Sequence, residues 1–372
     1  MSVVVLQRLA IPIPGGQIPF VTVLIFGALF VAFMLRRVVI LPRRLTAYLF
    51  ILASAIATTL QPDASPTSVI QLALLWAPFV FAVGPHSPHA FMRGIVVASA
   101  VAGGLGLLQS LVSRSSGVFL DPIGVLPPGY VLDRFNTTYP VIFGGSWMKA
   151  NGVFFLEPSF LSLACALSLV YVFTGAPRIG NSIGRAAIGV ALVFGMISSV
   201  AISGLVVVPF LLAGKGLRKR LLAIAAAAVL TLGVAAQLGI WQEFQHRASG
   251  GLDSGSNSAR LVRPYTELVP DGLADSPVLG QGPGTARRAV ALANTDWRTE
   301  TTTPTLAKAL YEYGLVGVAL LGAAVLSVAR RYRLGLAAML AIVVAFVLPT
   351  DGLTSSFLVP LLLLADMPER DG

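Results

Sequence analysis

Charged residues are scarce in this 372-residue chain, and that scarcity excludes an ordinary soluble globular protein. Asp, Glu, Lys and Arg make up 11% of the residues, whereas hydrophobic residues make up 56% and the mean hydropathy is +0.83. Soluble domains contain about 25% charged residues. The composition is therefore that of an integral membrane protein, and the length suits one compact helical bundle over residues 1–372.

Cysteine and histidine are nearly absent, which excludes two further kinds of site. Cys165 is the only cysteine and falls in an apolar run, so the sequence predicts no intramolecular disulfide and no cysteine metal cluster. The histidines, His86, His89 and His246, lack a zinc-binding spacing. We expect no metal and no cofactor, and we keep His246 as a reserve candidate for acid–base chemistry.

Long apolar runs are abundant, and they predict an all-α, polytopic transmembrane helix bundle with about 11 spans and one large outer loop. A spanning helix needs about twenty apolar residues. Runs of this kind are found at about 18–36, 45–60, 67–84, 91–112, 153–174, 184–200, 201–214, 220–240, 304–328, 334–349 and 353–366.

The basic residues predict the orientation, because short cytoplasmic loops retain Lys and Arg. With the amino terminus outside and the carboxyl terminus inside, the inner segments hold fifteen basic and three acidic residues. The outer segments then hold ten basic and twelve acidic residues. The net charge of +10 therefore reflects topology and anionic lipid on the cytoplasmic face, and we do not expect nucleic-acid binding.

Two long outer segments, about 113–152 and 241–303, are the candidate functional loops. The second is polar for about sixty residues and contains six arginines and seven carboxylates. Long loops in compact folds tend to be functional. A large polar loop on the outer side suggests that a ligand is bound outside the cell or at the membrane surface.

The strongest candidate for a catalytic segment is 149–159, which has the sequence KANGVFFLEPS and leads into the fifth predicted span. Glu157 is expected about four residues, or about 6 Å, into that span, where an ionisable group costs about 2.5 to 3.5 kcal/mol. Such a carboxylate is a candidate general base for a sugar hydroxyl. The alternative is a helix-start carboxylate that caps free amides before Pro158.

Further ionisable candidates lie in and beside the large loop. Lys308 and Glu312, at i,i+4 in the ninth span, form either a self-neutralising pair or a site for an anionic headgroup. Arg260 and the pair 287–288 are candidates for bidentate phosphate binding, although a single exposed arginine is more often a solvated surface charge. The glycine-rich turn 280–284 is a weaker candidate, since it lacks the strand–turn–helix context of a nucleotide fold.

The sequence segments described above resemble the O-antigen polymerase and O-antigen ligase superfamily of bacterial envelope glycosyltransferases. The resemblance lies in the order of the segments along the chain and in their predicted sides of the membrane. The resemblance covers most of the chain. The matching parts are Lys149 with Gly152 and Glu157-Pro158-Ser159, the serine-rich break Ser198 to Gly204, the outer loop with 258–260 and 276–284, and the helix 306–317.

The resemblance implies a GT-C-like fold and metal-independent glycosyl transfer at the outer leaflet of the bacterial cytoplasmic membrane. The implied donor is a glycan on a polyprenyl diphosphate. Glu157 would take the proton of the acceptor hydroxyl, and Lys149 and Arg260 would stabilise the departing diphosphate. Implied partners are the lipid bilayer and a chain-length regulator and flippase of the same pathway. The predicted substrate-binding residues are Arg134, Asn151, Arg287, Arg288, Lys308 and Glu312.

The chain departs from the family pattern at three places. Family members often have an arginine at the position of Lys149, another in the serine-rich break at Ala201 and Ile202, and a histidine–asparagine pair at Thr302 and Thr303. The missing histidine counts against a ligase, and the Glu-Pro-Ser element favours a polymerase. Transfer of finished polymer to an acceptor remains the alternative within the family.

Three other classes stay open. A transporter of polysaccharide or its lipid carrier also has many spans, but it does not need a large outer loop. A peptidoglycan polymerase of the shape and division family would need a catalytic loop aspartate. A non-catalytic scaffold would tolerate substitution of every candidate residue. The loop aspartates available for the second class are Asp253, Asp271, Asp275 and Asp296.

Overall fold

A computed structural model of the chain shows a mostly helical protein that divides into two compact units. Unit 1 comprises Met1–Val23, Ser87–Gly251 and Leu334–Ala341, and unit 2 comprises Leu24–His86, Leu252–Arg333 and Ile342–Gly372. The structure describes residues 2–13, 16–83, 88–133, 135, 137–141, 147–175, 182–212, 262–292, 303–329 and 336–347.

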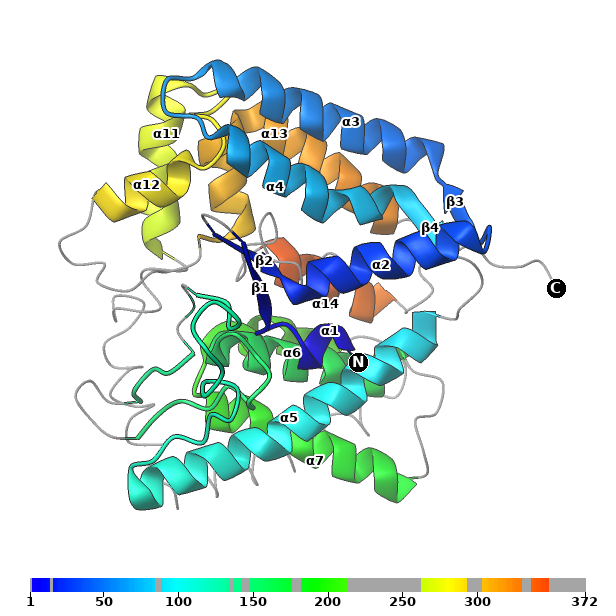
Figure 1. The fold of residues 1–372 in the computed structure, drawn as a ribbon, viewed down its shortest axis with the longest axis vertical. Helices are drawn as coiled ribbons and strands as arrows, with labels where there is room; N and C mark the ends of the chain where they lie inside the picture. Colours follow the sequence, from blue (N-terminus) through cyan, green and yellow to red (C-terminus); the bar gives the residue numbers. More distant parts are fainter. Residues whose placement is uncertain are drawn as a thin grey trace. The chain divides into compact units, whose positions relative to one another are not determined.

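Unit 1 is built on three helices that pack together, α5 (Pro88–Ser116), α6 (Pro158–Val170) and α7 (Ser182–Ser199) (Figure 1). The remaining elements are α1 (Ser2–Val5), the antiparallel pair β1 (Ala10–Ile13) and β2 (Gly16–Pro19), the π-helical turn η3 (Tyr171–Gly175) and the 3₁₀ helix η4 (Ile202–Leu212). Helices α2 (Phe20–Met34) and α14 (Leu336–Val347) have residues in both units.

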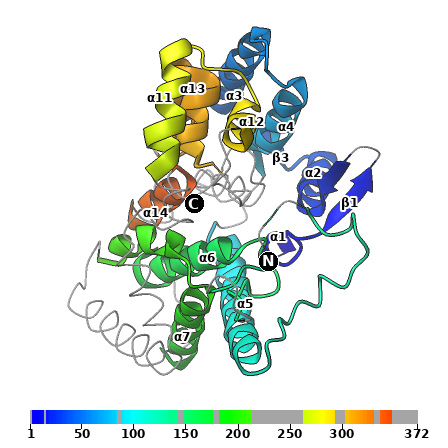
Figure 2. The ribbon, with the colours of Figure 1, turned by 90° about the vertical axis from the view of Figure 1, so that its left-hand side faces the viewer.

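Unit 2 is built around α13 (Thr305–Ala329), which packs against α3 (Pro42–Ala57) and α11 (Val269–Asp275), as Figure 2 shows for α11. The short strands β3 (Val38–Ile40) and β4 (Phe81–Val83) pair antiparallel, with Val39 opposite Ala82. The other elements are η1 (Thr58–Leu60), α4 (Pro66–Trp76), η2 (Ala77–Val80), η7 (Pro264–Leu268) and α12 (Thr285–Leu292).

Proline marks the beginning of four helices. Helices α3, α4, α5 and α6 start at Pro42, Pro66, Pro88 and Pro158. Proline suits the first helical position because its fixed φ is already helical and its missing N–H would have no partner there. The fifth predicted span, 153–174, therefore begins as a helix only at residue 158. Glu157 consequently precedes the helix, which corrects the expectation that it lies one turn inside.

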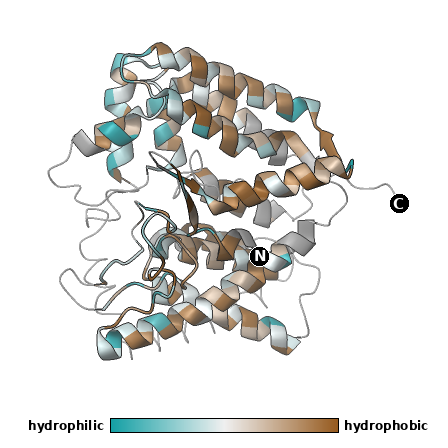
Figure 3. Cartoon of the chain, viewed as in Figure 1, coloured by the Kyte–Doolittle hydropathy of each residue, from teal (hydrophilic) through white to brown (hydrophobic). Residues whose placement is uncertain are grey.

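The expectation of about 11 spans is not borne out in the part of the chain that the structure describes. Three helices there are long and apolar enough to cross a membrane, Met92–Ser116, Ser182–Ser199 and Thr305–Ala323. Apolar residues also predominate along α2 (Figure 3), but α2 has only 15 residues. The predicted runs 220–240 and 353–366 lie outside the described residues. Shorter apolar helices are Phe20–Met34, Pro66–Val80 and Pro158–Phe173.

Local features of the sequence explain why several predicted apolar runs do not form α-helices of membrane-spanning length. The run 18–36 begins in strand β2, so its helix starts only at Phe20. Pro78 lies in the 3₁₀ helix η2, after which the chain becomes strand β4. Pro209 lies inside the 3₁₀ helix η4. Proline has no amide hydrogen to donate to the preceding turn, so an apolar run that contains it does not have to be one α-helix.

Helix α13 is broken at Gly314, and a loop of unit 2 pairs the backbone groups that the break releases. Gly314 has φ 61° and ψ −162°, a conformation that is essentially restricted to glycine. Amides of residues 315–316 donate to the carbonyls of 277–278 over 3.0 and 3.2 Å. Amides of 281–282 donate to the carbonyls of 311–312 over 2.8 and 2.9 Å. We call segment 276–284 the glycine loop.

We predict that Gly314→Ala lowers the free energy of unfolding by about 2 to 3 kcal/mol. An added Cβ would lie 2.5 Å from the Val278 carbonyl oxygen and 2.7 Å from the Gly280 amide nitrogen. The measurement is thermal unfolding of the purified protein in detergent.

The matched control is Gly322→Ala, in the same helix. A Cβ there would meet nothing within 4 Å, and alanine favours the helix by about 1 kcal/mol over glycine. Equal unfolding temperatures for the two variants would contradict the proposed role of Gly314.

Candidate functional site

Glu157 is the buried carboxylate at the amino-terminal end of α6. It is extended, with φ −139° and ψ 155°, and only 1% of its surface is exposed. Its side chain makes no capping hydrogen bond to a backbone amide. Instead, Oε2 accepts a hydrogen bond of 2.9 Å from the Ser159 hydroxyl. Glu157 therefore lies at the helix start, as the capping alternative predicts, but it does not make the predicted hydrogen bond to a backbone amide. The positive end of the helix dipole favours a negative charge at this position.

Serine hydroxyls form hydrogen bonds between the serine-rich break, Ser198 to Gly204, and the first turn of α6. The Ser203 hydroxyl donates to the Ser159 carbonyl oxygen over 2.7 Å, and the Ser162 hydroxyl donates to the Ala201 carbonyl oxygen over 2.9 Å. The Gly204 amide donates to the Ser162 hydroxyl over 3.1 Å. Two parts of the sequence resemblance, Glu-Pro-Ser and the serine-rich break, thus lie together in unit 1.

Lys149 lies at the other end of the segment that leads to Glu157. It is 7% exposed, and its Nζ lies 4.7 Å from the centroid of the Tyr139 ring. An ammonium group within about 6 Å of an aromatic face is attracted by the ring. The Lys149 amide also donates to the Tyr139 carbonyl oxygen over 2.8 Å. Lys149 is therefore a buried cation whose backbone and side chain are both held against Tyr139.

Asn151 is fully buried and holds the turn between Lys149 and Glu157. Its Nδ2 donates to the Thr137 carbonyl oxygen over 3.1 Å. Its Oδ1 accepts from Gln109 Nε2 over 3.1 Å and from the Val153 amide over 3.0 Å. Gln109 Oε1 accepts from the Gly152 amide over 2.8 Å. These bonds give Asn151 a structural role, and its contact with substrate stays a prediction.

Sequence reasoning missed Gln109 and the ion pair of Arg8 with Asp121. Gln109 is buried and is the one amide side chain in the mostly apolar helix α5, which is a detectable signal. Arg8 is 1% exposed and binds both oxygens of Asp121 over 2.6 and 2.7 Å. Arg8 Nη1 also donates to the Val153 carbonyl oxygen over 2.7 Å. An arginine in an apolar amino-terminal segment was visible, but its partner was not.

The remaining described candidates belong to unit 2. Lys308 and Glu312 are buried on α13, with 9% and 1% of their surfaces exposed. Arg287 and Arg288 are exposed on α12, and Arg288 donates to the Asp63 backbone carbonyl oxygen. The other sequence candidates lie outside the described residues: Arg134, His246 and Arg260.

Three amides of the glycine loop that were considered for phosphate binding have partners within the protein. The Gly280 amide donates to the Ser276 carbonyl oxygen, while the amides of 281–282 donate to α13. The Ser65 amide donates in turn to the Pro283 carbonyl oxygen over 2.8 Å. The amides of residues 280–282 are therefore engaged within the protein, which favours a structural role for this part of the turn.

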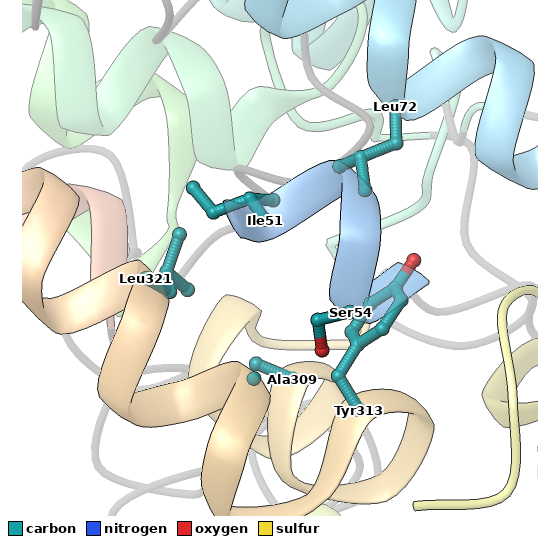
Figure 4. Close-up of a pocket in the computed structure, with 7 residues that line it drawn as sticks. Ile51, Ser54, Leu72, Ala309, Tyr313 and Leu321 are labelled. Atoms are coloured by element: carbon teal, nitrogen blue, oxygen red, sulfur yellow. The ribbon is translucent and has the colours of Figure 1, made fainter. Parts of the chain in front are cut away.

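A small, partly open pocket lies among α3, α4 and α13 in unit 2. Figure 4 shows Ile51 and Ser54 from α3, Leu72 from α4, and Ala309, Tyr313 and Leu321 from α13 around it. Its lining is mostly apolar and contains no lysine, arginine or carboxylate, so it offers no charged group for catalysis. The candidate site residues do not line it.

Within the described ranges, no group of three or more His, Cys, Asp or Glu side chains is arranged to hold a metal ion. Comparison with protein-family models gave no match, and comparison with curated proteins gave none either. A functional proposal therefore depends on the buried residues around Glu157 and on the resemblance seen in the sequence.

We predict that Gln109→Leu destabilises unit 1 by about 1 to 3 kcal/mol, because the change removes hydrogen bonds to two buried polar groups. These groups are the Gly152 amide and Asn151 Oδ1. The measurement is the unfolding temperature in detergent. Gln71→Leu, at an exposed position of α4, is the control and should change that temperature little. Equal temperatures would show that the Gln109 bonds do not hold the turn.

Proposed function

We propose that the protein is a membrane glycosyltransferase that polymerises polyprenyl-diphosphate-linked oligosaccharide units at the outer leaflet. The pathway would be the biosynthesis of a cell-surface polysaccharide such as O-antigen, exopolysaccharide or capsule. The observation that carries the proposal is Glu157, a carboxylate that is 1% exposed at the start of an apolar helix. A buried charge of this kind is costly, and a residue that costly is a functional candidate by default.

The proposed chemistry uses Glu157 as the general base. The acceptor hydroxyl oxygen attacks the anomeric carbon of the donor, and its proton passes to Glu157. The bond between the anomeric carbon and the diphosphate oxygen breaks, and the electron pair leaves with the diphosphate. Ser159 supports this role because its hydroxyl fixes one carboxylate oxygen over 2.9 Å. The other oxygen is then oriented by the same bond.

The departing diphosphate needs positive charge, which the proposal assigns to side chains. Lys149 is the buried cation at the opposite end of the segment from Glu157. Arg260 and Arg287 would bind phosphate oxygens through their guanidinium groups. Arg287 and its neighbour Arg288 are exposed on α12 and are therefore accessible to an anionic ligand. Lys308 and Glu312 complete the proposed substrate-binding set, and no metal or other cofactor is proposed.

The proposed setting is the bacterial cytoplasmic membrane, with the amino terminus and the large loop outside and the carboxyl terminus in the cytoplasm. Three helices long and apolar enough to cross a membrane support a membrane location. The positive residues of the predicted inner loops support the orientation. Proposed partners are the lipid-linked glycan, the bilayer, and a chain-length regulator and flippase of the same pathway.

We predict that Glu157→Gln abolishes chain growth while leaving the protein in the membrane, because the amide cannot accept the hydroxyl proton. The measurement is a size profile of lipid-linked and surface glycans in a strain lacking the protein. That strain is complemented with wild type, Glu157→Gln or Glu267→Gln. Glu267 is the matched control, since its side chain is 54% exposed.

Single repeat units that persist while long chains vanish are the expected result for the deletion and for Glu157→Gln. Long chains that accumulate on the carrier would instead identify a ligase. A full wild-type profile from Glu157→Gln would remove Glu157 from the base role. A deletion strain with an unchanged profile would turn the interpretation toward transport or another substrate.

We predict that Arg260→Lys lowers transfer about tenfold, because lysine keeps the charge but loses the bidentate geometry. The measurement is donor affinity and turnover of purified protein with lipid-linked donor. The control is Arg263→Lys, at an arginine that is 37% exposed and lies 3.6 Å from Glu267. Unchanged donor affinity and turnover for Arg260→Lys would refute bidentate recognition by this residue.

A further inference from the structure

Arg8 carries a buried charge whose partners come from two distant parts of unit 1. Its guanidinium makes two short hydrogen bonds to Asp121 and one to the Val153 carbonyl oxygen. Stability alone is a weak reason for such a pair, since well-packed apolar residues of similar volume are often as stable or more stable. A buried ion pair that fixes one particular geometry has a better physical rationale.

The carbonyl that Arg8 binds belongs to a strained turn. Val153 has φ 69° and the preceding Gly152 has φ 64°. A β-branched residue at positive φ is an outlier that costs about 1 to 3 kcal/mol and persists only where its surroundings hold it. Here both backbone polar groups of Val153 are held, the amide by Asn151 over 3.0 Å and the carbonyl by Arg8 over 2.7 Å.

The strained turn joins the two charged ends of the candidate site. Lys149 is fixed against Tyr139 on one side of it. Glu157 is fixed at the start of α6 on the other side. The conformation of residues 151–153 therefore sets how the lysine and the carboxylate are placed within unit 1.

We infer that Arg8 is a positioning residue of the transfer reaction, which acts through Val153 to fix the segment from Lys149 to Glu157, and that Asp121 orients it. The inference rests on the proposed function, because it assigns Arg8 an effect on the step that Glu157 performs. Asp121 fits the orienting role because its side chain is 15% exposed in the first outer segment, and Arg8 is 1% exposed. The partly exposed Asp121 carboxylate therefore binds the buried Arg8 guanidinium on the side nearer to the protein surface.

The test compares Arg8→Gln, Arg8→Lys and Asp121→Asn with wild type by two measurements on the full-length protein in detergent. The first is transfer kinetics with lipid-linked donor, expressed per folded molecule. The second is hydrogen exchange of the peptide spanning 150–157, which does not depend on activity. Arg114→Gln is the matched control. It removes an exposed arginine of unit 1 that lies 5.6 Å from the Trp147 ring and does not touch the turn.

We predict that Arg8→Gln and Asp121→Asn lower kcat about 100-fold with KM for the donor within about twofold of wild type, since misplacement by about 1 Å has effects of this size. Arg8→Lys restores part of kcat, because its ammonium supplies one of the three bonds. Exchange of 150–157 accelerates about tenfold or more in Arg8→Gln, while peptides of α7 keep wild-type exchange. Arg114→Gln keeps wild-type values in both measurements.

Two results would overturn the inference while leaving the proposed function in place. Unchanged exchange of 150–157 in Arg8→Gln would show that Arg8 does not hold the turn. Faster exchange with unchanged kcat per folded molecule would show that it serves stability only. If Arg8→Gln does not fold, Arg8→Lys and Asp121→Asn decide by the same criteria.

Failure of the proposed function has a different signature. Full activity of Glu157→Gln, or no transfer by wild type, would overturn the role of Glu157 and with it the positioning role of Arg8. The exchange measurement would still show whether Arg8 holds the turn, so the structural clamp is judged separately from the chemistry.

Discussion

A helix that ends or breaks in apolar surroundings leaves backbone amides and carbonyls that must find partners within the protein, and this constraint governs both units. In unit 2, the glycine loop exchanges four backbone hydrogen bonds with α13 on the two sides of Gly314. In unit 1, Gln109, Asn151 and Arg8 do the same for the turn at 152–153 with side-chain groups. Polar loops are therefore part of the helical framework, because they pair the groups that the helices release.

This constraint separates the structural parts of the sequence resemblance from the chemical ones. The glycine loop and the Glu-Tyr-Gly segment of α13 occur together because each satisfies the backbone of the other. The serine-rich break accompanies Glu-Pro-Ser because its hydroxyls and amides bond to the first turn of α6. Both pairs of segments are explained by hydrogen bonding alone, without a catalytic role. The chemical proposal is thereby reduced to a few side chains, chiefly Glu157 and Lys149.

The sequence predicted what depends on local rules and failed where distant residues meet. The apolar runs predicted at 45–60, 67–84 and 91–112 begin within three residues of the starts of α3, α4 and α5. Glu157 was identified as a costly carboxylate and is buried, although it precedes α6 instead of lying inside the helix. Within the described residues, hydropathy alone overestimated the number of membrane-spanning helices, because it does not register that proline or a short strand divides an apolar run. The bond between Arg8 and Asp121 joins residues 113 positions apart, so no periodicity or spacing could reveal it.

Buried formal charges offer a last argument for where the chemistry lies. In the described part of the chain they are Arg8, Arg44, Lys149, Glu157, Lys308 and Glu312. Arg8 binds Asp121, and Arg44 contacts the carbonyl oxygen and the ring of Phe79 at 3.2 and 5.2 Å. The other four comprise one lysine and one glutamate in each unit. The proposed glycosyl transfer would use these two kinds of group, a cation for the leaving diphosphate and a carboxylate for the hydroxyl proton.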